Sequence, residues 1–100
     1  MKKLALFTML AAAAAFAGSW TGYVSETKCG AAHADGSEKS IKCVTGCIKS
    51  GAKPVLVVNG KVVGIHNPES VPASLYGKKV TVTGDKMDDA VHIAKIEAAE

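Results

Sequence analysis

The chain contains no arginine, so its twelve basic residues are all lysines. Phosphate groups and nucleic acids are typically bound by guanidinium groups and by clusters of basic residues. When the two lysines that follow Met1 are set aside, the remaining lysines are scattered and the formal charge falls from +3 to +1. We therefore do not expect a nucleic-acid partner.

The chain has only three cysteines, and no two of them are spaced as Cys-x-x-Cys. Their spacing argues against a thioredoxin-like redox motif and against Cys-x-x-Cys-His haem attachment. Because the number is odd, at least one thiol is free, bound to a metal or shared with another molecule. No acid or oxyanion donor can be assigned to a thiol nucleophile, so an enzyme is not expected.

The first residues have the organisation of a secretory signal peptide. A pair of lysines precedes an apolar stretch at residues 4–16, and residues 15–17 read Ala-Phe-Ala, a typical cleavage signal. The apolar stretch is too short to span a membrane and has no stop-transfer flank. We predict a signal peptide at residues 1–17, and a mature protein that is exported, periplasmic or extracellular, with no membrane span.

Residues 18–100 then form one small domain of 83 residues, a size that often needs a disulfide or a metal to reinforce a modest core. Runs of β-branched residues predict five strands in this domain, and Asn59-Gly60 between two such runs predicts a type I′ hairpin. We expect the strands at residues 19–25, 54–58, 61–65, 78–83 and 90–96. Gly22, inside the first of them, suggests a bulge or a bend.

One helix is expected over residues 41–50, with Ser37 or Ser40 as its N-cap and Gly51 just past its end. The element order predicts a mainly β fold, a small five-stranded OB-like antiparallel Greek-key barrel with a loop and helix inserted after the first strand. A β-sandwich and a helix-capped meander are the competing architectures.

The inserted loop and helix carry every cysteine of the chain, in the pattern Cys29-x3-His33-x9-Cys43-x3-Cys47. Cys43 and Cys47 share one flank of the predicted helix, because positions i and i+4 lie about 40° apart. These four side chains would make a Cys3His site, and thiolates and imidazole suit Zn or Cu. The predicted metal ligands are therefore Cys29, His33, Cys43 and Cys47.

A disulfide is the other interpretation of the same cysteines, since an exporting compartment oxidises thiols. Cys29 bonded to Cys43 or Cys47 would close a loop of about 15 to 19 residues and stabilise the domain by roughly 3 kcal/mol. We therefore expect an exported binding module fastened by a disulfide among these cysteines, its partner an unknown small ligand or another protein. Metal binding through the Cys3His cluster and thiol redox chemistry through Cys43 and Cys47 are the alternatives.

The mature region resembles a group of small exported bacterial domains of unknown function. The similar segments are Gly-Tyr-Val-Ser-Glu at 22–26 leading to Cys29-Gly30, the Cys-x3-Cys segment running to Lys53, and the strand between Gly77 and Gly84. The resemblance implies an OB-like fold and an exported protein. It implies no activity, because OB-like barrels support many functions.

Overall fold

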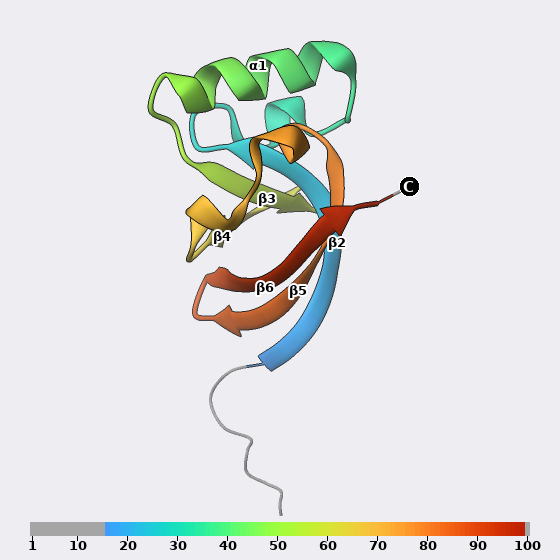
Figure 1. Cartoon of the computed structure of the whole chain (residues 1–100), viewed down its shortest axis with the longest axis vertical. Coiled ribbons are helices and arrows are strands. Elements are labelled where there is room, and N and C mark those ends of the chain that lie inside the picture. Colours follow the sequence, from blue (N-terminus) through green and yellow to red (C-terminus); the bar gives the residue numbers. More distant parts are fainter. Residues whose placement is uncertain (1–15, 100) are drawn as a thin grey trace, which may run out of the picture.

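A computed structural model describes residues 16–99 of the chain, so most of the predicted signal peptide lies outside the described part. Figure 1 shows a β-barrel with a single α-helix lying across one end. In chain order the elements are β2 (Phe16–Glu26), η2 (Gly30–His33), α1 (Glu38–Lys49), β3 (Pro54–Val58), β4 (Lys61–Ile65), η3 (Pro68–Ser70), η4 (Ala73–Leu75), β5 (Lys79–Met87) and β6 (Ala90–Ala98). Within residues 16–99 no helix is long and apolar enough to cross a membrane.

The five strands close into a barrel in the order β2-β3-β4-β6-β5, and the last strand of this order pairs again with the first. Four of the five neighbouring pairs are antiparallel. The pair β4 and β6 is parallel, in the register Gly64 to Ala90 and Ile65 to Val91. The expected all-antiparallel barrel is therefore wrong in this one pairing. The two strands run the same way because η3, η4 and β5 intervene between them and bring the chain back before β6 begins.

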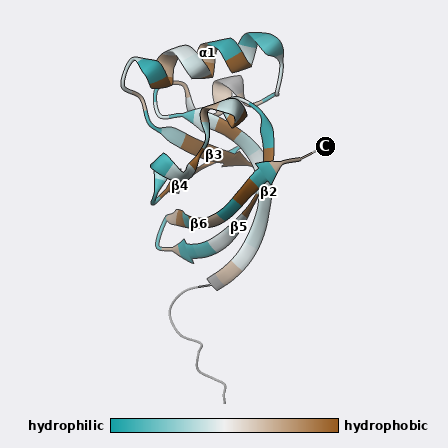
Figure 2. Cartoon of the chain, in the orientation of Figure 1, coloured by the Kyte–Doolittle hydropathy of each residue, from teal (hydrophilic) through white to brown (hydrophobic). Residues whose placement is uncertain are grey.

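The barrel interior is filled mainly by β-branched side chains on the inward-facing positions of the strands. Figure 2 shows hydrophobic segments recurring along the strands, with hydrophilic residues between them. The buried cluster consists of Val24, Leu56, Val71, Val80, Val82, Val91 and Ile93. On β5 the alternation of Val80 and Val82 with more exposed threonines follows the expected period of two, since successive strand residues face opposite sides of a sheet.

Two local predictions from the sequence are confirmed by the backbone. Asn59 and Gly60 both have positive φ, at 52° and 80°, as a type I′ turn requires, and Val58 pairs with Lys61 across the turn. Gly22 lies in regular register opposite Val80, so the expected bulge is not there. Instead, Gly22 allows a close backbone approach, because a Cβ atom on it would lie 2.2 Å from the carbonyl oxygen of Val57.

The helix begins and ends at residues whose chemistry suits those positions. Ser37 is the N-cap, and its hydroxyl accepts a hydrogen bond from the backbone N–H of Ser40 at 3.1 Å. Past the end, Gly51 has φ of 115°, and the N–H of Ala52 donates to the carbonyl of Cys47. This is the Schellman arrangement, which satisfies carbonyls that the end of a helix leaves without partners.

Changing Ser37→Ala should lower the free energy of unfolding by about 1 kcal/mol, because one N–H in the first turn of α1 then loses its acceptor. Urea unfolding followed by circular dichroism measures the change. Lys39→Ala, on the exposed first turn, is the matched control and should change the stability little. Equal stability of the Ser37 and Lys39 variants would contradict the capping role.

Candidate functional site

The site is centred on Glu26, the last residue of β2, whose side chain has no exposed surface. Its carboxylate accepts hydrogen bonds from the backbone N–H groups of Lys28 and Cys29. One residue earlier, the hydroxyl of Ser25 donates to the carbonyl of Gly30. These contacts hold the loop after β2 against the end of the strand, and they fix Cys29 next to a buried carboxylate.

Two of the three cysteines, Cys29 and Cys47, come within electrostatic range of this carboxylate from two different segments. Cys29 is the N-cap of η2, whereas Cys43 and Cys47 lie one turn apart on α1. Cys29 and Cys47 interact electrostatically with Glu26, with Cys43 and with each other. Cys29 and Cys47 thus lie within electrostatic range of Cys43 and of each other, and all three side chains are half-buried and joined by no disulfide.

Burial and negative neighbours both act on the acidity of these thiols. Desolvation is the largest influence that raises the pKa of Cys29 and of Cys47, and the carboxylate of Glu26 and the thiol of Cys43 raise both values further. Lys28 acts in the opposite direction. Each thiolate is therefore disfavoured while no cation is present to balance the charge.

A hollow of about 260 Å³ opens beside the thiols. Cys43 and Cys47 line it together with Lys28 and Lys42, whose ammonium groups can remain in solvent because both residues are exposed. An ion or a small reagent could reach the two α1 thiols through this opening.

The fourth predicted ligand, His33, ends η2, but its side chain lies outside the described part of the structure. Among the side chains that are described, no group of three or more His, Cys, Asp or Glu residues is placed closely enough to hold a metal ion as it stands. Metal binding at the thiols therefore requires these side chains to move closer together. The Cys3His set stays a prediction.

The raised thiol pKa values predict that stability falls at alkaline pH under reducing, metal-free conditions. The folded protein keeps its protons on Cys29 and Cys47 at a pH where unfolded thiols, with a pKa of about 8.5, release them. Their contribution is thus complete below the unfolded pKa and is lost as pH rises through the folded values. Denaturant unfolding midpoints, determined at several pH values between about 7 and 10, measure this loss of stability. The double variant Cys29→Ser, Cys47→Ser should flatten the slope, and an unchanged slope would contradict the assignment.

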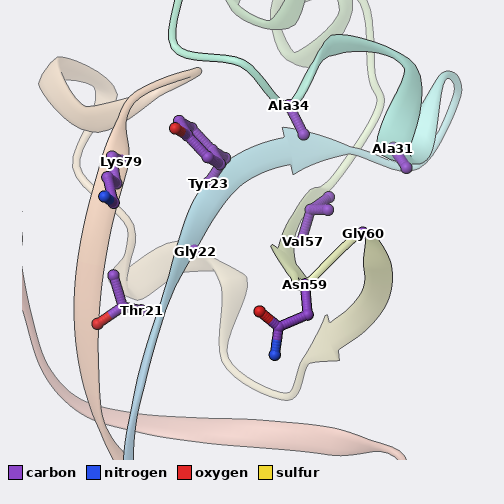
Figure 3. A pocket seen from close by; sticks show the side chains of 9 residues that line it. All are labelled: Thr21, Gly22, Tyr23, Ala31, Ala34, Val57, Asn59, Gly60 and Lys79. Carbon is purple, nitrogen blue, oxygen red and sulfur yellow. The ribbon is translucent and has the colours of Figure 1, made fainter.

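A second cavity, of about 460 Å³, lies on the outer face of the barrel where β2 meets β3 and β5. Figure 3 shows Tyr23 and Lys79, which are cross-strand neighbours, on one side of it and Asn59 on the other. Ala31 and Ala34, from the inserted segment, border the same cavity. The cavity thus combines an aromatic ring, an amide and a cation over a small apolar surface.

Sequence reasoning missed Glu26 as part of the site, although it lies in the segment that carries the family resemblance. A lone glutamate at the end of a strand is normally expected on the surface. Only its hydrogen bonds to the two following turn residues show why it is buried. The outer cavity was also missed, because its lining comes from four separate segments of the chain.

Comparisons of the chain with protein-family models, with curated proteins and with solved structures find no match.

Proposed function

We propose that the protein binds a soft metal ion, Zn or Cu(I), through the thiolates of Cys29, Cys43 and Cys47. The observation that carries the proposal is that the thiols of Cys29 and Cys47, which interact with each other and with Cys43, lie beside the buried carboxylate of Glu26. Thiolates held so near a carboxylate repel one another, and a cation removes this repulsion when it displaces their protons. His33, four residues after Cys29, is the proposed fourth ligand of a tetrahedral site.

The proposal includes an OB-like fold and export. The strand order β2-β3-β4-β6-β5 supports an OB-like barrel, with the helix-bearing insertion between its first two strands. Export is supported by the signal-peptide pattern at residues 1–17. The cleavage bond after Ala17 would lie within β2, so the mature strand would begin two residues later than the described one.

Intact mass of the exported, mature protein tests metal binding against disulfide formation. The native spectrum should retain a metal ion, and the denatured, non-reduced protein should take up three alkyl groups. A chain lighter by two hydrogen atoms, with a single alkylated cysteine and no metal, would overturn the metal proposal. Denatured protein that is alkylated three times but carries no metal from a zinc-supplemented culture would also overturn it.

A second candidate is a binding module whose inserted segment is fastened by a disulfide between Cys29 and one cysteine of α1. The outer cavity favours this function, because OB-like barrels use the loop after the first strand to bind ligands, and Ala31 and Ala34 of that loop border the cavity. Tyr23 and Asn59 would contact the ligand, a small molecule or an exposed protein segment. In nuclear magnetic resonance screening with a fragment mixture, the amides of Gly22 and Gly60 should respond first, and no response there would contradict the cavity as the site.

Thiol redox catalysis receives less support from the structure. The attacking species in thiol exchange is the thiolate, and the surroundings of Cys29 and Cys47 raise their pKa instead of lowering it. We therefore do not propose an oxidoreductase.

A further inference from the structure

Two histidines that are 26 residues apart in the sequence meet on the surface of the barrel. The Nδ1 atoms of His66 and His92 lie 3.1 Å apart, and the ring centroids are 5.3 Å apart with the planes inclined at 49°. Both side chains are exposed, so solvent and solutes reach them. Each histidine alone has the sequence context of an ordinary surface residue, and only the barrel brings the pair together.

The backbone holds this pair in place from both sides. The N–H of His66 donates to the carbonyl of Val91, at the parallel pairing of β4 with β6. The side chain of Asn67 then clamps Ile93, since its amide oxygen accepts from the Ile93 N–H at 2.8 Å and its amide nitrogen donates to the Ile93 carbonyl at 2.9 Å. Residues next to each histidine are thus hydrogen-bonded to the segment that carries the other histidine. These bonds fix the Cα positions of His66 and His92 in the absence of a ligand.

The distance between the two nitrogens fits two ligands of one metal ion as well as it fits a hydrogen bond. Two nitrogens that are each 2.0–2.1 Å from one ion lie about 2.9 Å apart at a right angle and about 3.3 Å apart at the tetrahedral angle. The 3.1 Å between the Nδ1 atoms lies between these values. If the two exposed rings rotate so that both lone pairs face one ion, they can bind it, since neutral imidazole is a preferred ligand of Zn, Cu and Ni.

The surrounding charge also favours a cation. Asp85 on β5 is the direct cross-strand partner of His92, and opposed residues of an antiparallel pair share one face of the sheet. Asp88 and Asp89 form the adjoining turn between β5 and β6. Lys86 is the basic residue of this turn region, so acidic groups outnumber basic ones there.

We propose that His66 and His92 form a second metal site, which binds a divalent transition-metal ion such as Zn²⁺ through the two Nδ1 atoms, with water completing the coordination. It is independent of the thiol site, because the histidines lie at the end of β4 and on β6, whereas the cysteines lie in the segment inserted between β2 and β3. The all-nitrogen protein ligands suit Zn²⁺, Cu²⁺ and Ni²⁺, and the thiols suit softer ions.

Titration of the mature protein with Zn²⁺, followed through the imidazole resonances of each histidine, tests the proposal residue by residue. His66 and His92 should shift together and reach saturation, and His66→Gln and His92→Gln should each weaken this step at least about 10-fold. Lys39→Gln, on the exposed first turn of α1, is the control and should leave it unchanged. Failure of the thiol proposal would be seen separately, as three alkylated thiols without bound metal in the intact-mass experiment.

Repeating the titration with Cys29, Cys43 and Cys47 changed to serine removes competition from the thiols, and the response of the histidine pair should persist. If His66 and His92 do not respond up to about 1 mM Zn²⁺ in either protein, the pair is only an imidazole hydrogen bond and the proposal is overturned. A response in only one of the two histidines would also overturn it.

Discussion

Changing any one of the three cysteines to serine should weaken Zn²⁺ binding at the thiol site at least about 100-fold, because a four-ligand zinc site gains about 10–16 kcal/mol and each thiolate supplies a large share of it. Cys29→Ser, Cys43→Ser and Cys47→Ser should therefore have similar effects. The affinities are measured by competition with a chromophoric zinc chelator under reducing conditions. Thr45→Ser, on α1 and roughly opposite the cysteines, is the control that should bind normally.

The disulfide interpretation predicts a different pattern for the same three variants. Each of the two variants that lacks a cysteine of the disulfide would be less stable by roughly 3 kcal/mol in non-reducing buffer. The variant of the third cysteine would have nearly wild-type stability. Three equal losses of metal affinity support the proposed function. Two equal losses of stability with no zinc binding by the wild-type protein would contradict it and would support the stapled binding module.

Local signals in the sequence were sufficient for most of the fold. The Asn-Gly turn, the alternation on β5 and the serine cap of α1 each depend on residues within one short segment, and each is found where it was expected. The ends of the elements were less predictable. The helix begins at Glu38, three residues before its expected start, because Ser37 caps it.

Long-range relations explain what sequence reasoning could not supply. The parallel pairing of β4 with β6 depends on how the barrel closes, and no local pattern records it. The placement of Cys43 and Cys47 one turn apart on a helix was recoverable because their spacing is helical. Glu26 and the pair of His66 and His92 are single polar residues without a distinctive local pattern, so only the folded chain shows what surrounds them.

The largest effect on stability is expected at Gly84, which is buried in β5 where the register with β6 shifts. A Cβ atom added there would lie 2.0 Å from the carbonyl oxygen of His92 and 3.1 Å from the N atom of Ala94. Both atoms belong to the backbone of β6, so no flexible side chain can move aside. Gly84→Ala should therefore cost about 3 kcal/mol or more, a large part of the 5–15 kcal/mol that stabilises a typical domain.

Gly46→Ala is expected to have the opposite effect on stability. Gly46 lies inside α1, and an added Cβ atom would meet nothing within 4 Å. Since alanine has the higher helix propensity, this variant should be more stable by about 0.5–1 kcal/mol. Thermal unfolding of both variants measures the contrast. If Gly84→Ala unfolds at the wild-type temperature, the backbones of β5 and β6 are not as close at Gly84 as described. The position of His92 beside His66 would then have to be revised as well.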